Sequence, residues 1–88
     1  MPIPPKIILH DAVSSRITEL LEKNRYSRED LAAVSGVPKS TITDYLRGAS
    51  RDIKLETIVK IANGFGLTVR DFFDDDRFDL IDIEDLLY

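Results

Sequence analysis

The pattern of apolar and polar positions along the chain predicts a series of short amphipathic helices. A first helix over residues 11–24, capped by Asp11, carries apolar residues at i, i+4, i+7 and i+8. The same spacing returns over residues 55–66, where Gly66 is the expected stop, and in a short segment opened by Thr68. We therefore expect an all-α fold with short links. The residues expected to face inward are Val13, Ile17, Leu20, Leu21, Leu31, Val34, Leu55, Ile58, Val59, Ala62, Phe65, Val69 and Phe72.

Residues 27–48 carry the densest set of helix-boundary signals and predict two helices joined by a tight turn. Ser27 and Asp30 form a Ser-x-x-Asp variant of the capping box, which predicts a helix over about residues 28–34. Gly36 follows where the chain must reverse, because a left-handed residue there ends the helix without a Cβ penalty.

The second of these helices is predicted over about residues 38–47, opened by Pro38 and closed by Gly48. A helical wheel at about 100° per residue separates an apolar side from a small-polar and basic side. Such a helix, held at a fixed angle by the preceding one, is what the major groove of DNA admits. The pattern therefore predicts binding to duplex DNA. The polar side consists of Lys39, Ser40, Thr43, Asp44 and Arg47.

The net charge of -4 at pH 7 argues against a nucleic-acid partner until its distribution is considered. Residues 1–70 contain 11 Lys and Arg against 8 Asp and Glu, a net +3, whereas residues 71–88 contain 1 against 8, a net -7. A mildly basic body thus carries an acidic end.

Composition narrows the other possibilities. The 88 residues include no cysteine and no apolar run of the roughly 20 residues that a membrane span needs, so we expect a cytoplasmic protein with no membrane partner. One histidine, no glycine-rich phosphate loop and no metal-ligand spacing argue against an enzyme and predict neither metal nor cofactor.

The two ends of the chain are harder to interpret. Residues 1–10 predict an extended arm because of three prolines, and this arm could lie over the core, pair across a dimer or touch DNA. His10 is expected at the surface or as a cap. In the acidic-apolar tail, residues 75–88, Phe78 to Leu80 alternates like a strand, while residues 82–88 fit a short helix. The tail could cap the core or serve a dimer, bind a partner, or mimic DNA.

Taken together, LAAVSGVPKSTITDYLRG and LETIVKIANGFGLTVRDFF resemble the lambda-repressor-like, Cro and XRE type of helix-turn-helix regulator over about residues 14–73. The resemblance implies a compact five-helix domain over residues 11–74, with the helix that starts at Pro38 as the recognition helix. It also implies a transcriptional regulator, usually a repressor, that binds double-stranded DNA as a homodimer. The features that carry the resemblance are Leu31, Ala32, Gly36, Ile42, Gly48, Leu55, Ile58, Ile61, Ala62, Phe72 and Phe73.

Carried over position by position, the resemblance assigns roles to eight residues. Lys39 could read guanine or hold a phosphate, and Asp44 could accept from cytosine or be neutralised by Arg47. The residues expected to contact bases are Lys39, Ser40, Thr43 and Asp44, and those expected to contact phosphates are Arg28, Thr41, Arg47 and Arg51.

A second hypothesis stays open at this point. The chain could be a protein-interaction module, or an antitoxin-like protein, whose acidic tail binds a basic partner while the helices remain as predicted.

Overall fold

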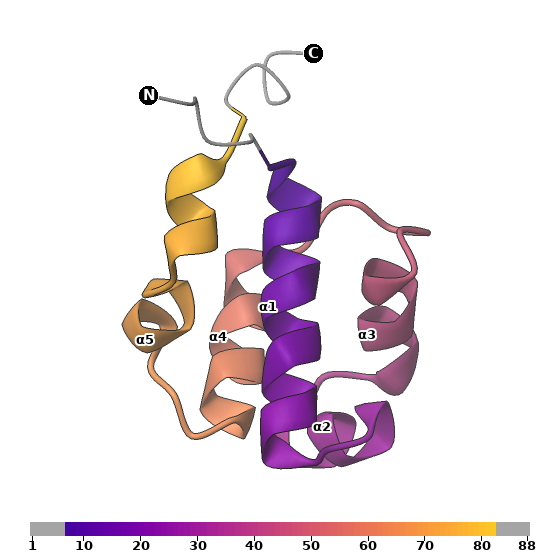
Figure 1. The fold of residues 1–88 in the computed structure, drawn as a ribbon. Coiled ribbons are helices and arrows are strands. Elements are labelled where there is room, and N and C mark those ends of the chain that lie inside the picture. Colours follow the sequence, from indigo (N-terminus) through magenta and orange to yellow (C-terminus); the bar gives the residue numbers. More distant parts are fainter. Residues whose placement is uncertain (1–6, 83–88) are drawn as a thin grey trace.

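The computed structural model describes residues 7–82, with a central helix α1 that has α3 on one side and α4 and α5 on the other (Figure 1). The described elements are α1 (Leu9–Asn24), α2 (Arg28–Ser35), α3 (Lys39–Leu46), α4 (Leu55–Gly64), α5 (Val69–Phe73) and a 3-10 helix, η1 (Asp76–Leu80). The predicted all-α fold with five α-helices is confirmed. Every helix within residues 7–82 is too short or too polar to cross a lipid bilayer.

Helix α1 provides one wall of the core, with Ile17 only 1% exposed at its centre. The helix begins at Leu9, directly after the extended residue Ile8, so the prediction that Asp11 caps it is wrong. Asp11 lies instead in the first turn, where a carboxylate is favoured by the helix dipole. The helix ends at Asn24, and its C-cap, Arg25, adopts a left-handed conformation with φ of 55°.

The core joins four helices around a few completely buried side chains. Ile17 of α1, Leu31 of α2, Ile61 of α4 and Phe72 of α5 are each 1% exposed or less. Burial of one such side chain contributes roughly 1.5–3 kcal/mol relative to leaving it in water. The predicted apolar stripes of these helices therefore meet in one place.

Gly64 lies where α4 packs against α2. A Cβ atom there would stand 3.0 Å from the Ser35 Cβ, 3.2 Å from Val34 Cγ2 and 3.3 Å from Leu31 Cδ1. The glycine therefore allows the two helices to approach closely, a role beyond the modest loss of helix propensity that a glycine brings. Val34 stays 52% exposed at the edge of this contact, so the prediction that it faces inward is wrong. Leu55, at the start of α4, is likewise 64% exposed rather than inward-facing.

The two ends of the described chain meet in what we call the terminal closure, residues 7–8 together with 76–82. Ile7 and Ile81 form an isolated parallel bridge. The Ile7 N–H donates to the Leu80 carbonyl at 2.7 Å, and the Asp82 N–H donates to the Ile7 carbonyl at 2.8 Å. The pairing of the predicted arm with the tail thus forms within one chain.

The terminal closure corrects the prediction for the start of the tail. Phe78 to Leu80 does not form a strand but belongs to η1, because Asp75 caps a tight turn there by accepting from the Arg77 N–H. Phe78 covers the edge of the core, with its ring centroid 4.9 Å from that of Phe73. The predictions for residues 1–6 and 83–88 lie outside the described residues.

Arg77 fastens η1 to α1. Its guanidinium donates to Asp75 Oδ1 at 2.6 Å, to Ser15 Oγ at 3.1 Å, and to Glu19. The hydrogen bond from Arg77 lowers the pKa of the Asp75 carboxyl, with a partial offset from burial. Because α1 and η1 are distant in sequence, this cluster ties the last described segment to the first helix.

Candidate nucleic-acid interface

Helix α2 begins as the sequence predicts. The Asp30 N–H donates to Ser27 Oγ at 3.0 Å, and the Ser27 N–H donates to Asp30 Oδ2 at 2.8 Å, which completes a capping box. The hydrogen bond from the Ser27 backbone N–H lowers the pKa of the Asp30 carboxyl most, and the Ser27 side chain lowers it further. The start of α2 is therefore fixed by two residues three positions apart.

The turn between α2 and α3 is anchored by one buried side chain. Gly36 adopts a φ of 76° and its N–H donates to the Ala32 carbonyl, as expected for a left-handed helix stop. Val37 follows and is only 4% exposed, with its N–H donating to Ser35 Oγ at 3.1 Å. Pro38 is the N-cap of α3 rather than its first helical residue, a one-residue difference from the prediction.

Helix α3 presents a polar face to solvent and buries the opposite face. Ile42 and Tyr45, 2% and 3% exposed, hold it against the core. Since these anchors fix the rotation of the helix, the direction of the polar face is fixed as well. The exposed residues along α3 and at its end are Lys39, Ser40, Thr41, Asp44 and Arg47.

Lys39 has a partner that the sequence did not indicate. Its Nζ donates to Glu29 Oε1 on α2 at 2.7 Å, and both side chains are more than half exposed. An exposed pair of this kind contributes only about 0.2–1 kcal/mol, so Lys39 can leave Glu29 at little cost. The ten-residue separation between the two explains why helical spacing alone did not pair them.

Two expectations about the polar side of α3 differ from the structure. Thr43 is half-buried, and its hydroxyl oxygen is buried without a hydrogen-bond partner among the described residues, so this oxygen does not face solvent. The proposed Asp44–Arg47 ion pair does not form within residues 7–82. Both Asp44 and Arg47 are exposed.

The C-terminal end of α3 is tied to the start of α1. The Tyr45 carbonyl accepts from the Gly48 N–H at 3.1 Å and from His10 Nε2 at 2.6 Å. Because a carbonyl oxygen only accepts, Nε2 of His10 is the donor in this hydrogen bond. His10 is 9% exposed and its ring meets that of Tyr45 edge-on at 4.6 Å, so the prediction of a surface histidine is wrong. The alternative prediction, a capping residue, agrees with its hydrogen bond to a last-turn carbonyl of α3.

Cationic side chains flank α3 on both sides. Arg28 begins α2 and is half-buried, while Arg47 and Arg51 are exposed in the link after α3. A cleft of about 370 Å³ between α3 and α4 is lined by residues that include Thr41 and Lys54. Lys54 was not predicted as a site residue. The one indication in the sequence is its position as a basic residue directly before the apolar stripe of α4.

A family model described as Helix-turn-helix (HTH_3) matches residues 17–72, which include all of α2 and α3. The chain belongs to this family. The predicted helix-turn-helix relationship is thereby confirmed, and with it a non-enzymatic, DNA-binding class of transcriptional regulator. The turn of the helix-turn-helix is the segment anchored by Val37, and its second helix is α3.

Two further comparisons agree with this assignment. The chain is 30% identical over 61 residues to the SPbeta prophage-derived uncharacterized HTH-type transcriptional regulator YotL of Bacillus subtilis (strain 168), which covers 69% of this chain and 76% of YotL. A chain of the solved SinR protein/SinI protein complex superposes with a TM-score of 0.64 at 21% identity, covering 85% of this chain and 73% of that chain. The latter likeness concerns the fold of the helix-turn-helix domain.

Proposed function

We propose that this helix-turn-helix protein represses transcription by sequence-specific binding to double-stranded DNA, with α3 in the major groove. The observation that carries the proposal is the fixed orientation of α3, whose Ile42 and Tyr45 are buried while Ser40 and Asp44 are exposed on the other side. A helix anchored in this way presents short polar side chains at a constant depth, as groove readout requires.

Base contacts are proposed for Lys39, Ser40, Thr43 and Asp44. Lys39 leaves Glu29 and donates to guanine O6 or N7, the strongest base contact that this face offers. Thr43 contributes through its methyl group, which suits the C5-methyl of thymine, since its hydroxyl oxygen is buried. Asp44, free of an ion pair among the described residues, accepts from a cytosine amino group.

Phosphate contacts are proposed for Arg28, Thr41, Arg47 and Arg51. Arg28 lies on α2, Arg47 and Arg51 lie at the end of α3 and in the link that follows, and Thr41 lies on α3 itself. Contacts to phosphate from these places would fix the position of the helix without reading sequence. The three arginines also supply positive charge near α3 in a chain whose net charge is -4.

A homodimer is part of the proposal, because one α3 offers a single strong base contact. Two copies on half-sites one helical turn apart, about 34–36 Å, would double the contacts and require a palindromic site. We expect such a dimer to act in the cytoplasm.

Selection from a pool of random duplex oligonucleotides tests the proposal most directly. We expect an enriched palindromic site whose half-sites lie one turn apart. Its affinity should fall steeply with salt, with a log-log slope of about -5 if three arginines per subunit contact phosphate. Failure to enrich any duplex, or binding independent of salt, would contradict the proposed function.

A further inference from the structure

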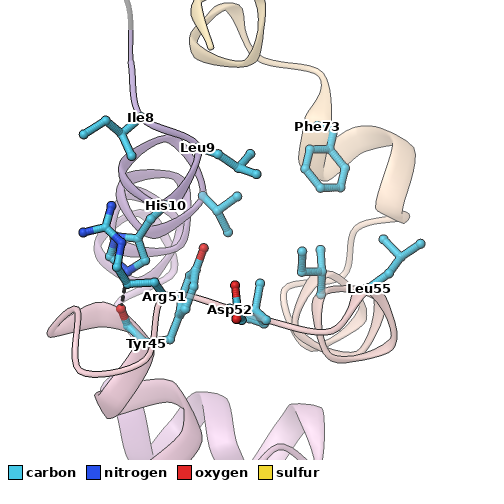
Figure 2. A pocket seen from close by; sticks show the side chains of 11 residues that line it. Ile8, Leu9, His10, Tyr45, Arg51, Asp52, Leu55 and Phe73 are labelled. Carbon is cyan, nitrogen blue, oxygen red and sulfur yellow. Dashed lines mark hydrogen bonds between the residues drawn. The ribbon is translucent and has the colours of Figure 1, made fainter. Parts of the chain in front are cut away.

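Helix α3 is joined to the other helices of the described chain by hydrogen bonds at only two points. At its start, Lys39 pairs with Glu29 of α2, and both side chains are more than half exposed. At its end, His10 of α1 donates from Nε2 to the Tyr45 carbonyl at 2.6 Å, in a buried position (Figure 2). Since Lys39 leaves Glu29 under the proposed function, the bond from His10 is the one that remains.

The His10 side chain fills the space beside the end of α3. It is 9% exposed, and its ring meets the Tyr45 ring edge-on with centroids 4.6 Å apart. A Cβ atom added at Gly48 would stand 4.0 Å from His10 Cε1, so the ring also lies beside the turn that follows α3. A buried side chain that donates to a last-turn carbonyl caps the helix from outside it.

The contacts that hold this end of α3 constrain different motions. Burial of Ile42 and Tyr45 decides which face of α3 points inward, but apolar contact is non-directional and leaves the tilt of the helix loosely defined. The hydrogen bond is directional, so it also fixes where the Tyr45 carbonyl lies relative to α1. A helix of eight residues depends on such tertiary contacts, because isolated helices of this length are not stable.

A small tilt of α3 would matter most at the end where His10 acts. Eight residues rise roughly 12 Å, so a tilt of about 5° about the Lys39 end displaces the Arg47 end by about 1 Å. Binding sites need their side chains placed within about 0.5 Å. Contacts from Asp44 and Arg47 would therefore be weakened, whereas those from Lys39 would be kept.

We propose that His10 is a positioning residue for DNA recognition, which sets the tilt of α3 and thereby the base pair read from its C-terminal half. The inference rests on the proposed function of α3, and the base contact that depends most on His10 is that of Asp44. It adds a specificity determinant that is itself buried and lies 35 positions away from the residue it holds.

Two substitutions separate the hydrogen bond from the packing of the ring. His10→Phe keeps a buried aromatic ring but lacks the donor, and His10→Gln places an amide N–H donor at a similar reach. The Tyr45 carbonyl still accepts from the Gly48 N–H in both variants, so no buried acceptor is left unpaired. Asn24→Leu is the matched control, because Asn24 donates to the Leu20 carbonyl at 2.8 Å in a bond that does not involve α3.

Amide hydrogen exchange of the free protein tests the positioning without DNA. The Arg47 and Gly48 amides donate to carbonyls of the last turn of α3, whereas the Ile42 amide lies nearer the start of the helix. In His10→Phe we expect the first two to be accelerated about threefold or more beyond any acceleration at Ile42. His10→Gln and the control should match the parent. Equal acceleration of all three amides, or none, would overturn the inference.

Affinities for single-base-pair variants of the selected site test the effect on base readout. Lys39→Ala and Asp44→Ala first identify the base pair that each residue reads, as the position where its loss relaxes discrimination. His10→Phe should reduce discrimination by about threefold or more at the Asp44 base pair and by less than about twofold at the Lys39 base pair. His10→Gln should restore both.

The outcomes separate this inference from the proposed function. Failure of the parent protein to bind any duplex would contradict the proposed function, and with it the claim about base readout. If His10→Phe lost the same affinity for every site and for random duplex, the proposed function would stand and the inference would be overturned. Failure of His10→Gln to restore exchange and discrimination would also overturn it, because the ring and not the hydrogen bond would then be responsible.

Discussion

The helix-turn-helix unit, α2 with α3, and the terminal closure are held together by opposite kinds of contact. The boundaries of the unit depend on near neighbours, as in the hydrogen bonds between Ser27 and Asp30 and the left-handed Gly36. The terminal closure depends on groups more than fifty positions apart, such as Arg77 with Ser15 and Glu19. The unit should therefore tolerate loss of the closure, while changes on the exposed face of α3 should affect binding and leave stability intact.

The largest change in the free energy of unfolding is expected for a substitution in the core, against which both the helix-turn-helix unit and the terminal closure pack. Leu31→Ala removes a completely buried side chain from α2 and should lower the free energy of unfolding by about 2–5 kcal/mol. Urea unfolding followed by circular dichroism measures this loss. Val34→Ala on the same helix, at a half-exposed position, should cost far less. Equal losses for the two variants would show that Leu31 is not the anchor of α2.

Lys39→Ala should separate binding from stability. We expect a loss of about 1–3 kcal/mol in affinity for the selected site, and much less on random duplex. The free energy of unfolding should change little, because the Lys39–Glu29 pair is exposed. Fluorescence anisotropy with both duplexes measures the affinities.

Glu29→Gln is the matched variant for Lys39. It frees the same ammonium without removing it, so it should tighten binding slightly. If Lys39→Ala lost the same affinity for the selected site and for random duplex, Lys39 would contact a phosphate and not a base.

In contrast to Lys39→Ala, Arg77→Ala should lower stability and leave DNA binding unchanged, because it weakens only the terminal closure. Loss of its contacts with Asp75, Ser15 and Glu19 should lower the free energy of unfolding by about 1–2 kcal/mol, since the cluster is partly exposed. Hydrogen exchange should show faster exchange of the Ile7 and Asp82 amides, which pair across the closure.

The amides of α3 should keep their protection in Arg77→Ala, and affinity for DNA should stay unchanged. Arg70→Ala is the control, because Arg70 is an exposed arginine without an ion pair among the described residues. Loss of α3 protection in Arg77→Ala would mean that the two regions are not independent.

Low pH should lower the stability of the helix-turn-helix unit and of the terminal closure, because each contains one carboxylate that contributes to stability when ionised. We expect this to be the smallest of the effects. The pKa values of Asp30 and Asp75 are both lowered on folding from an ordinary value of 3.8. The stability that these carboxylates contribute is thus present above pH 4 and is lost as pH falls through their folded values. Urea midpoints between pH 7 and pH 2 measure the slope.

Asp30→Asn and Asp75→Asn should each flatten the acid limb of that profile. The first removes the contribution of the capping box and the second that of the Arg77 contact. An unchanged slope in either variant would show that its carboxylate titrates alike in the folded and unfolded states.

The sequence predicted the helices well because their signals are local. The capping box at Ser27, the stop at Gly36 and the opening of α5 at Thr68 each depend on residues at most three positions apart. Apolar periodicity then located the core residues, although it could not tell that Val34 and Leu55 lie at edges.

Features that depend on distant partners could not be predicted in the same way. His10 was expected at the surface because its acceptor, the Tyr45 carbonyl, lies 35 positions away. The packing role of Gly64 could not be predicted, because its contact with Ser35 exists only after α2 and α4 pack. The exposed polar face of α3 was predicted by its periodicity, while its role in DNA binding and the roles of its individual residues stay predictions.

The bridge between Ile7 and Ile81 makes the described chain almost a closed loop. A chain in which two such distant positions meet can be joined there by a short linker and opened elsewhere, and it keeps the same core. The exposed link after α3 is a natural place for new ends, since it connects helices that are held by separate buried residues. In such a rearranged molecule α4 would come first in the chain and α3 last. If it folds to the same structure, the fold does not depend on the order of the helices along the chain.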